Sequence, residues 1–353
     1  MITKKLVFDR NREEEWDFSE ANEIIRNGGL VAFPTETVYG LGGDATNPEA
    51  SKKIYAAKGR PSDNPLIVHI HDFKQLEAIA KNVPDDARKL CKAFWPGPLT
   101  MIVEKNETIP YETTGGMDTV AVRMPSHPIA RRFLQESNVM IAAPSANTSG
   151  RPSPTIARHV IEDLDGKIDC IIDGGSCDIG LESSIIDLST DIPTILRPGY
   201  INKEMFEKAL GKEVRIDPGI IDANANKGIR PKAPGMKYRH YAPKGNLVVV
   251  EGNDENVVSK INELAKTAFA EGKKVGIIAT DETKDRYETG NVVTIGDRND
   301  EDSIARHLFG VLRDFDDLEV DTIYSESFGT PRIGMAIMNR LLKAAGHQVI
   351  KVD

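Results

Sequence analysis

Two loops of this chain concentrate side chains suited to holding phosphate groups and orienting a small ligand. The first is AAKGRPSDNPLIVHI, residues 56–70, which carries Lys58, Arg60 and Asn64 around a proline turn. Cations and an amide displayed on irregular backbone are a common way to bind phosphate oxygens. A basic residue at a helix C-terminus would explain Lys58 alone, but not the whole run Lys-x-Arg-x-x-x-Asn. We therefore predict that this segment binds phosphate.

The second loop is MIAAPSANTSGRPSPT, residues 140–155, in which an apolar strand leads directly into Ser145 and Asn147. A strand whose end delivers hydroxyl and amide groups into a loop is typical of a ligand-binding edge. A role as the cap of the next helix would explain Ser153, but it leaves Ser145 and Asn147 unexplained. We interpret those two as ligand-binding residues.

A third stretch, FPTETVYGLGGDA, combines hydroxyl side chains such as that of Thr35 with a cluster of glycines. Gly40, Gly42 and Ala45 satisfy the dinucleotide pattern G-x-G-x-x-A. That fingerprint requires a helix to begin at the glycines, so that its N-terminus meets a pyrophosphate. Here the helix signal, an Asn-Pro pair, comes only after Ala45. We expect the glycines to let the backbone turn tightly beside a ligand instead.

Further polar side chains stand at predicted strand ends. TVAVRM carries Arg123, LESSIIDLS begins with Ser183, and TILRPG places Arg197 before a turn. Each arginine could be a solvated strand end, but together they suggest groups directed at one concavity. His69 and His71 share a strand face and could form a metal pair, yet no third ligand stands nearby in the sequence. We expect no metal held by the protein alone.

Several catalytic signatures are absent from the sequence. There is no GxxxxGK[ST] phosphate loop, no G-x-S-x-G nucleophile elbow and no Cys/His framework. The inventory therefore offers many binding groups and no attacking group. It suits a transfer in which the substrates supply nucleophile and electrophile, while the protein positions them and neutralises charge.

The elements that must position these loops predict an α/β protein of two domains. In the first part, the strand-like runs are GLVAF, PLIVHI, LTMIVE, TVAVRM, VMIAAP, CIIDGG, SSIIDLS and TILRPG, and helix patterns cover residues 19–26, 47–58, 72–81, 85–94, 128–136, 153–164 and 202–210. Several strands follow one another without a helix, which favours a twisted mixed sheet. After a Pro/Gly-rich segment, strands and helices alternate and predict a small, doubly wound parallel sheet. We place the domains at residues 1–215 and 245–353, with a linker at 216–244.

Composition narrows the class of protein. The 353 residues carry a net charge of -9, with 40% hydrophobic and 28% charged residues, as in a globular protein that does not coat nucleic acid. No apolar run is long enough to span a membrane, and the first residues have no secretory h-region. The three cysteines form no CxxC pair. We expect a cytoplasmic protein without membrane partners.

These motifs together resemble a known family. KGRPSDNPL with PSANTSGRPSPT is similar to the split Lys-x-Arg and Ser-x-Asn signature of the YrdC-type domain of the threonylcarbamoyl-AMP synthase family. FPTETVYGLG, FWPGPLT, VAVRMP, SSIIDLS and LRPG follow in the family's order, over residues 15–212. The remainder resembles the family's long form, in which a proline-rich linker with HYAP leads to a Rossmann-like domain.

The resemblance implies an enzyme, a nucleotidyltransferase that joins L-threonine, bicarbonate and ATP into L-threonylcarbamoyladenylate and releases pyrophosphate. A partner complex would then modify an adenosine next to the anticodon of certain tRNAs, and a weak contact with RNA is compatible with this. Mg²⁺ would accompany ATP, without a tightly bound organic cofactor. The residues that the resemblance assigns to ATP are Lys58, Arg60, Asn64, Thr119, Ser145, Asn147 and Arg197, with Lys58, Arg60, Ser145 and Asn147 as the catalytic set; those assigned to L-threonine are Thr35, His69, Arg123, Ala143 (through its backbone) and Ser183.

The linker contains a basic stretch without acidic residues between positions 223 and 250. Tyr238, Arg239 and His240 could fold over the site and exclude water from an adenylate that hydrolyses readily. The alternative is a solvated tether whose cations aid solubility. Deletion of residues 216–353 would lower the product yield only if the linker is a lid.

Two other functions stay open at this point. An RNA-binding module without turnover would grip double-stranded RNA or tRNA by its phosphates; the acidic charge and only 6% aromatic residues speak against it. A carbamoyl-phosphate hydrolase or transferase of related fold is the third, although zinc-finger cysteines typical of that class are missing.

Overall fold

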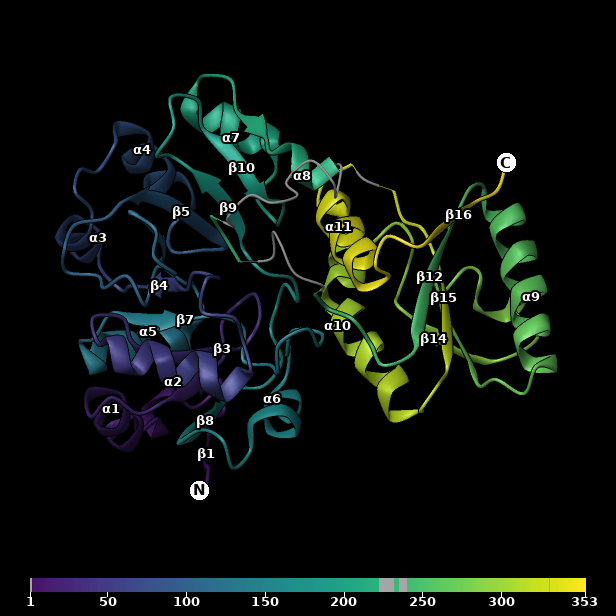
Figure 1. The fold of residues 1–353 in the computed structure, drawn as a ribbon, viewed down its shortest axis with the longest axis horizontal. Coiled ribbons are helices and arrows are strands. Elements are labelled where there is room, and N and C mark those ends of the chain that lie inside the picture. Colours follow the sequence, from purple (N-terminus) through teal and green to yellow (C-terminus); the bar gives the residue numbers. More distant parts are fainter. Residues whose placement is uncertain (1, 222–231, 235–239, 330) are drawn as a thin grey trace. The chain divides into compact units, whose positions relative to one another are not determined.

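The computed structural model describes residues 2–221, 232–234, 240–329 and 331–353. The chain forms two compact units (Figure 1). The N-terminal unit comprises Met1–Ser149, Ser153–Asp178 and Glu182–Lys237, and the C-terminal unit comprises Gly150–Pro152, Ile179–Leu181 and Tyr238–Asp353. The predicted lid residues Tyr238 and Arg239 lie outside the described residues.

The N-terminal unit is built on a mixed sheet, in which 11 strands are found among the described residues, in the order β1-β8-β2-β3-β7-β4-β6-β5-β9-β10-β11. The strands are β1 (Lys4–Val7), β2 (Val31–Phe33), β3 (Gly40–Asp44), β4 (Ile67–His69), β5 (Leu99–Glu104), β6 (Thr119–Arg123), β7 (Ile141–Ala143), β8 (Cys170–Asp173), β9 (Ser184–Asp187), β10 (Thr194–Arg197) and β11 (Arg215–Ile216). The helices are α1 (Ser19–Arg26), α2 (Pro48–Lys58), α3 (Phe73–Ile79), α4 (Asp85–Phe94), α5 (Pro128–Ser137), α6 (Ala157–Leu164), α7 (Lys203–Leu210) and α8 (Pro218–Ile221), with a 3₁₀ turn, η1, at Glu13–Glu15. Some neighbouring strands of this sheet are parallel and others are antiparallel, which confirms the predicted mixed sheet.

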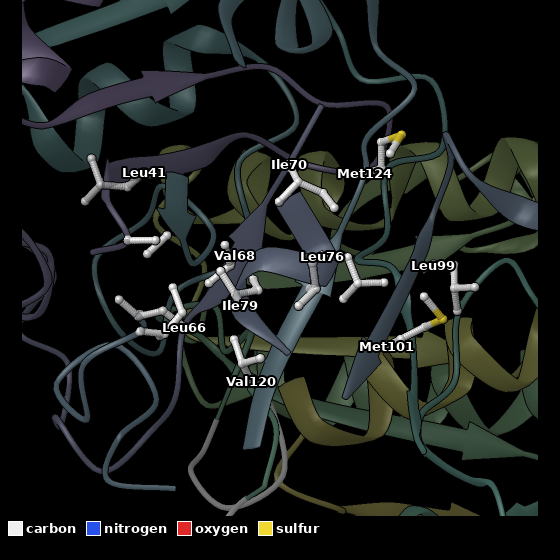
Figure 2. Close-up of a cluster of buried hydrophobic side chains, with 14 of the residues drawn as sticks. Leu41, Leu66, Val68, Ile70, Leu76, Ile79, Leu99, Met101, Val120 and Met124 are labelled. Atoms are coloured by element: carbon white, nitrogen blue, oxygen red, sulfur yellow. The ribbon is translucent and has the colours of Figure 1, made fainter. Parts of the chain in front are cut away.

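Strand alternation divides the centre of this sheet into two faces. Val68 and Met101 point into the main hydrophobic core, which also contains Leu76 and Ile79 of α3 (Figure 2). Val122 belongs to the same core. Because successive side chains of a strand point to opposite faces, the neighbours His69 and Arg123 lie on the other face. One face therefore packs on the main core, and the other carries the polar side chains of His69 and Arg123 together with a smaller apolar cluster.

Local signals fix several helix starts as predicted. Asn47 and Asn202 cap α2 and α7 by accepting bonds from backbone N–H groups of the first turn. Asp72 caps α3 in a capping box, in which its side chain and that of Gln75 each bind backbone N–H groups. The predicted helix over residues 153–164 begins too early, because α6 starts at Ala157.

We expected the glycines of the third motif to form a tight turn. That prediction is wrong, because they form the strand β3. Gly42 lies opposite Val31 of β2 in an antiparallel pair. A Cβ on Gly42 would stand 2.6 Å from Ile141 Cγ2, and one on Gly43 would stand 3.2 Å from both Ala50 and Ile54. Glycine is needed here because neighbouring side chains pack directly against the strand backbone.

The C-terminal unit has a parallel five-stranded sheet in the order β14-β13-β15-β12-β16. Its elements are β12 (Asn246–Glu251), α9 (Asp254–Ala270), β13 (Val275–Ala279), the 3₁₀ turn η2 (Lys284–Arg286), β14 (Asn291–Thr294), α10 (Glu301–Asp317), β15 (Thr322–Glu326), α11 (Gly334–Ala344) and β16 (Val349–Lys351). Helix α9 covers one face, and α10 and α11 cover the other (Figure 1). This arrangement confirms the predicted doubly wound sheet. No helix in the described part of the chain is long and apolar enough to cross a membrane.

Candidate functional site

The centre of the site is the polar face of strands β4 and β6. The two strands are parallel, with His69 opposite Arg123 and Ile67 opposite Ala121. Thr119 shares the face of Arg123, because residues two and four apart in a strand point the same way. Ala143 of β7 pairs with Ile67 from the other side, so its backbone borders the same face. Strand register alone thus brings three of the residues predicted to bind L-threonine, His69, Arg123 and Ala143, onto adjacent strands.

Arg123 is a buried cation tied to the motif that follows β2. Its Nη1 donates to Thr37 Oγ1 at 2.8 Å, and Thr37 Oγ1 lies 2.9 Å from Thr35 Oγ1. Its Nη2 lies 2.8 Å from Glu36 Oε1, and both side chains are 5% exposed. The structure therefore brings together Thr35 and Arg123, which are far apart in sequence, through Thr37. A guanidinium held in this way can present its remaining N–H groups to a carboxylate.

A second connected group contains Ser183, which directly precedes β9, and Arg197, the last residue of β10. Ser183 Oγ lies 2.7 Å from Thr100 Oγ1, and Thr100 is the β5 partner of Arg123. Arg197 donates from Nε to Ser183 O at 2.9 Å and from Nη2 to Ser183 Oγ at 3.1 Å. Thr100, Ser183 and Arg197 are all buried. Side-chain hydrogen bonds therefore connect Thr100 through Ser183 to Arg197, and strand register places Thr100 opposite Arg123.

The third group joins the two loops with which the sequence argument began. Lys58, the last residue of α2, is 1% exposed, and its Nζ donates to Ser145 O at 2.5 Å and to Asn147 O. Ser145 Oγ donates to Asn147 Oδ1 at 2.5 Å. Gly59 ends α2 in the left-handed conformation with φ 60°, which turns the chain into the loop. Lys58, Ser145 and Asn147 are thus one cluster, with the ammonium held among carbonyl oxygens.

Arg60 and Asn64 form a compact turn of their own. The Arg60 guanidinium donates to the carbonyl oxygens of Asn64 and Pro65 at 3.3–3.4 Å. The side chain of Asn64 is buried, and its Oδ1 has no hydrogen-bond partner among the described residues. This turn comes just before β4, and Thr119 is the first residue of β6. Because β4 and β6 are parallel neighbours, the turn and Thr119 lie at the same end of the two strands. This buried oxygen can accept a hydrogen bond from a ligand or from water.

His69 is a neutral imidazole in this environment. Burial, together with the nearby charge of Arg123, lowers the pKa of His69 to about 3. Its Nδ1 lies 3.0 Å from Ile67 O, and its ring meets that of Phe33 edge-on at 5.9 Å. His69 can therefore serve as a hydrogen-bonding wall of the site but does not add a positive charge.

Part of the predicted linker packs on the polar face of the sheet. Ala233 is fully buried in a small apolar cluster with Ile67, Ile102, Ala121, Ile185 and Leu196. Pro234 O accepts a bond from Arg197 Nη1 at 3.5 Å, and Lys232 Nζ lies 3.0 Å from Asp187 Oδ2. The third predicted lid residue, His240, belongs to the C-terminal unit, where its ring lies 5.5 Å from that of Tyr241. Residues 232–234 therefore cover the face that carries Arg197.

One expected alternative is wrong, and three site residues escaped prediction. Ser153 does not cap α6, since its Oγ donates to Glu182 Oε1 at 2.5 Å. Glu36, Thr37 and Thr100 contact the predicted residues but were assigned no role from the sequence, where Thr37 counted only as one of the hydroxyl side chains of its motif. Glu36 and Thr37 stand inside the PTET motif, which was the available signal, whereas Thr100 looks like an ordinary strand residue. In the described residues, no group of three or more His, Cys, Asp or Glu side chains could hold a metal ion.

Comparison with known proteins places the chain in a family. A family model described as "Telomere recombination" matches residues 23–199, and one described as "Threonylcarbamoyl-AMP synthase, C-terminal domain" matches residues 201–346. The chain belongs to the threonylcarbamoyl-AMP synthase family, in its long, two-domain form.

Full-length relatives agree with this assignment. The chain is 52% identical to the threonylcarbamoyl-AMP synthase of Pyrococcus abyssi, over 97% of this chain and 98% of that protein. It is 46% identical to the enzyme of the same name from Bacillus subtilis, over 99% and 100%. The crystal structure of P. abyssi Sua5 complexed with L-threonine superposes with a TM-score of 0.92 at 49% identity and covers 100% of both chains.

Proposed function

We propose that this protein is an L-threonylcarbamoyladenylate synthase, a nucleotidyltransferase that converts L-threonine, bicarbonate and ATP into threonylcarbamoyl-AMP and pyrophosphate. The observation that carries the proposal is the full-length similarity to a Sua5 structure that contains L-threonine. The buried, anchored Arg123 beside Thr35 and Thr37 supports an amino-acid site on the polar face of the sheet.

The reaction needs no protein nucleophile. The threonine amine and bicarbonate give a carbamate with loss of water, and a carbamate oxygen then attacks the α-phosphate of ATP with pyrophosphate as the leaving group. Arg123 would hold the threonine carboxylate and so keep it from attacking the phosphate itself. Neutral His69 and Ser183 would border the amino acid, and the buried site would exclude water from the product.

The triphosphate would lie along the loops that carry Lys58, Arg60, Ser145 and Asn147. It bears about four negative charges, so cations must offset its repulsion as it approaches the carbamate. Mg²⁺ bound with the nucleotide would neutralise part of this charge, and Lys58 and Arg60 would offset more of it. The nearby side chains are cations, amides and hydroxyls rather than paired carboxylates, which supports a metal carried by the nucleotide and not by the protein.

The product would pass to a complex that transfers the threonylcarbamoyl group to tRNA next to the anticodon. A cytoplasmic site for this reaction suits the cysteines, because Cys91, Cys170 and Cys177 are free. Burial raises the pKa of the Cys91 and Cys170 thiols to about 12, so neither is an activated nucleophile. This supports a mechanism by positioning and charge rather than by covalent catalysis.

Pyrophosphate release tests the proposal. The protein with ATP, Mg²⁺, bicarbonate and L-threonine should release pyrophosphate, and omission of any one substrate should abolish it. An RNA-binding module would instead retain tRNA at low salt and release no pyrophosphate in the full mixture. That second outcome would overturn the proposed activity.

A further inference from the structure

The Glu36–Arg123 ion pair is a buried charge pair with unused hydrogen-bonding capacity. Arg123 Nη2 lies 2.8 Å from Glu36 Oε1 and both side chains are 5% exposed. Apart from this ion contact, neither oxygen of Glu36 and neither Nε nor Nη2 of Arg123 has a hydrogen-bond partner among the described residues. Buried charges are normally satisfied by several hydrogen bonds. Two facing groups that both lack them are suited to receive a ligand.

The two partners are anchored unequally. Arg123 is held on strand β6 and by its bond to Thr37 Oγ1 at 2.8 Å. Glu36 lies in the loop between β2 and β3, and its carboxylate has only the contact with Arg123 among the described residues. His127, which precedes α5, and Cys177, which follows β8, lie within electrostatic range of Glu36. The carboxylate can therefore move away from Arg123 without breaking another bond.

We infer that Glu36 binds the α-ammonium group of the amino-acid substrate, while Arg123 binds its carboxylate. The inference rests on the proposed function and adds a specificity-determining residue to that site. In the free protein the ion pair satisfies both charges. On binding, the zwitterion enters between the two side chains, so that its carboxylate replaces Glu36 on Arg123 and its ammonium pairs with the displaced Glu36.

Charge balance makes this exchange selective. The ion pair is neutral and so is the zwitterion, which means that the buried site carries no net charge before or after binding. A ligand with a carboxylate but no ammonium would leave Glu36 as an unpaired buried charge, which is strongly unfavourable. A ligand with an ammonium but no carboxylate would leave Arg123 unpaired. The pair therefore selects α-amino acids over hydroxy acids and amines.

The test compares L-threonine with (2S,3R)-2,3-dihydroxybutyrate, which has a hydroxyl in place of the ammonium. Isothermal titration should show that the wild-type protein binds the hydroxy acid at least about 100-fold more weakly than threonine. In Glu36→Gln, threonine affinity should fall about 10- to 100-fold, and the preference for threonine should shrink to about threefold. The matched control is Glu136→Gln, which breaks an Arg132–Glu136 pair at 2.6 Å with 37–39% exposed side chains. Its affinities should match the wild type.

Two results would overturn the inference. The first is a Glu36→Gln protein that retains the wild-type preference for threonine over the hydroxy acid, because a structural role weakens both ligands equally. The second needs no variant and covers the case in which Glu36→Gln does not fold: equal binding of both ligands by the wild-type protein. Failure of the proposed function is distinct, since the wild-type protein would then release no pyrophosphate with L-threonine and bicarbonate.

Discussion

His127 makes the N-terminal unit sensitive to acid. The imidazole is 1% exposed, and neither ring nitrogen has a hydrogen-bond partner among the described residues. Burial, with a contribution from the charge of Arg10, lowers its pKa to about 4, although Asp178 and Glu36 act in the opposite direction. The unfolded chain binds a proton at this histidine near pH 6.5, and the folded chain does not. The contribution of His127 to the free energy of unfolding is therefore fully present above pH 6.5 and is lost as the pH falls toward 4.

The size of the effect follows from these two pKa values. At pH 5.0 the unfolded state gains about 2 kcal/mol from protonation of one such histidine, since each pKa unit corresponds to about 1.4 kcal/mol. At pH 7.5 the gain is close to zero. Buried His69, with a pKa of about 3, adds a similar loss in the same range. We expect the N-terminal unit to lose about 4 kcal/mol of unfolding free energy between pH 7.5 and 5.0 from these two residues.

Urea denaturation followed by tryptophan fluorescence measures this directly. Trp16 and Trp95 are the two tryptophans of the chain, and both belong to the N-terminal unit. In His127→Gln, the difference in unfolding free energy from the wild type should change by about 2 kcal/mol between pH 7.5 and 5.0, in favour of the variant at low pH. His347→Gln, in the C-terminal unit, should leave the fluorescence transition unchanged. A constant difference between wild type and His127→Gln at both pH values would refute the reasoning.

Three further predictions address the site and its packing. Lys58→Met should lower kcat/KM for ATP at least about 100-fold in the pyrophosphate assay, because it would remove the buried cation that we propose for phosphate binding. Lys53→Met, which removes a bond to a backbone carbonyl, should not, and equal activity of the two variants would argue against a role of Lys58 in ATP binding. Gly42→Ala should cost about 1–3 kcal/mol of unfolding free energy in calorimetry, since its Cβ would stand 2.6 Å from Ile141 Cγ2. Gly310 is a helix position with open space around it, so Gly310→Ala should instead stabilise its unit by about 0.5–1 kcal/mol. Serine should replace threonine with modest loss, because one methyl group is worth about 1–3 kcal/mol. Valine should be rejected strongly, because a site that hydrogen-bonds the threonine hydroxyl would leave its polar groups unpaired with valine, and equal adenylate formation with valine would contradict this.

The sequence predicts best those features that depend on neighbouring residues. Asn47, Asp72 and Asn202 cap helices because the cap and the N–H groups that it binds are close in the chain. Lys58 was singled out from its spacing to Arg60, and the structure places it as the last residue of α2, where Gly59 turns the chain into the loop; its role in phosphate binding stays a prediction. The strand alternation of LTMIVE and TVAVRM likewise predicted β5 and β6 as they occur.

Features that depend on distant residues were missed for physical reasons. Gly40–Asp44 has weak strand propensity, and only Ile141 and Ala50, packed against it in the folded chain, show why a strand without side chains fits there. Glu36 resembles any loop carboxylate until the fold brings Arg123 to its side chain. The assignment of site residues to ATP or to L-threonine rests on the family resemblance and not on a local sequence pattern.

Isotope labelling tests the central claim most directly. With ¹³C-bicarbonate, L-threonine and ATP, mass spectrometry should detect threonylcarbamoyl-AMP that carries one ¹³C atom, because the carbamoyl carbon comes from bicarbonate. An adenylate without the label would mean that the threonine carboxylate itself attacked the α-phosphate. That result would contradict the placement of the carboxylate on Arg123 and the proposed reaction.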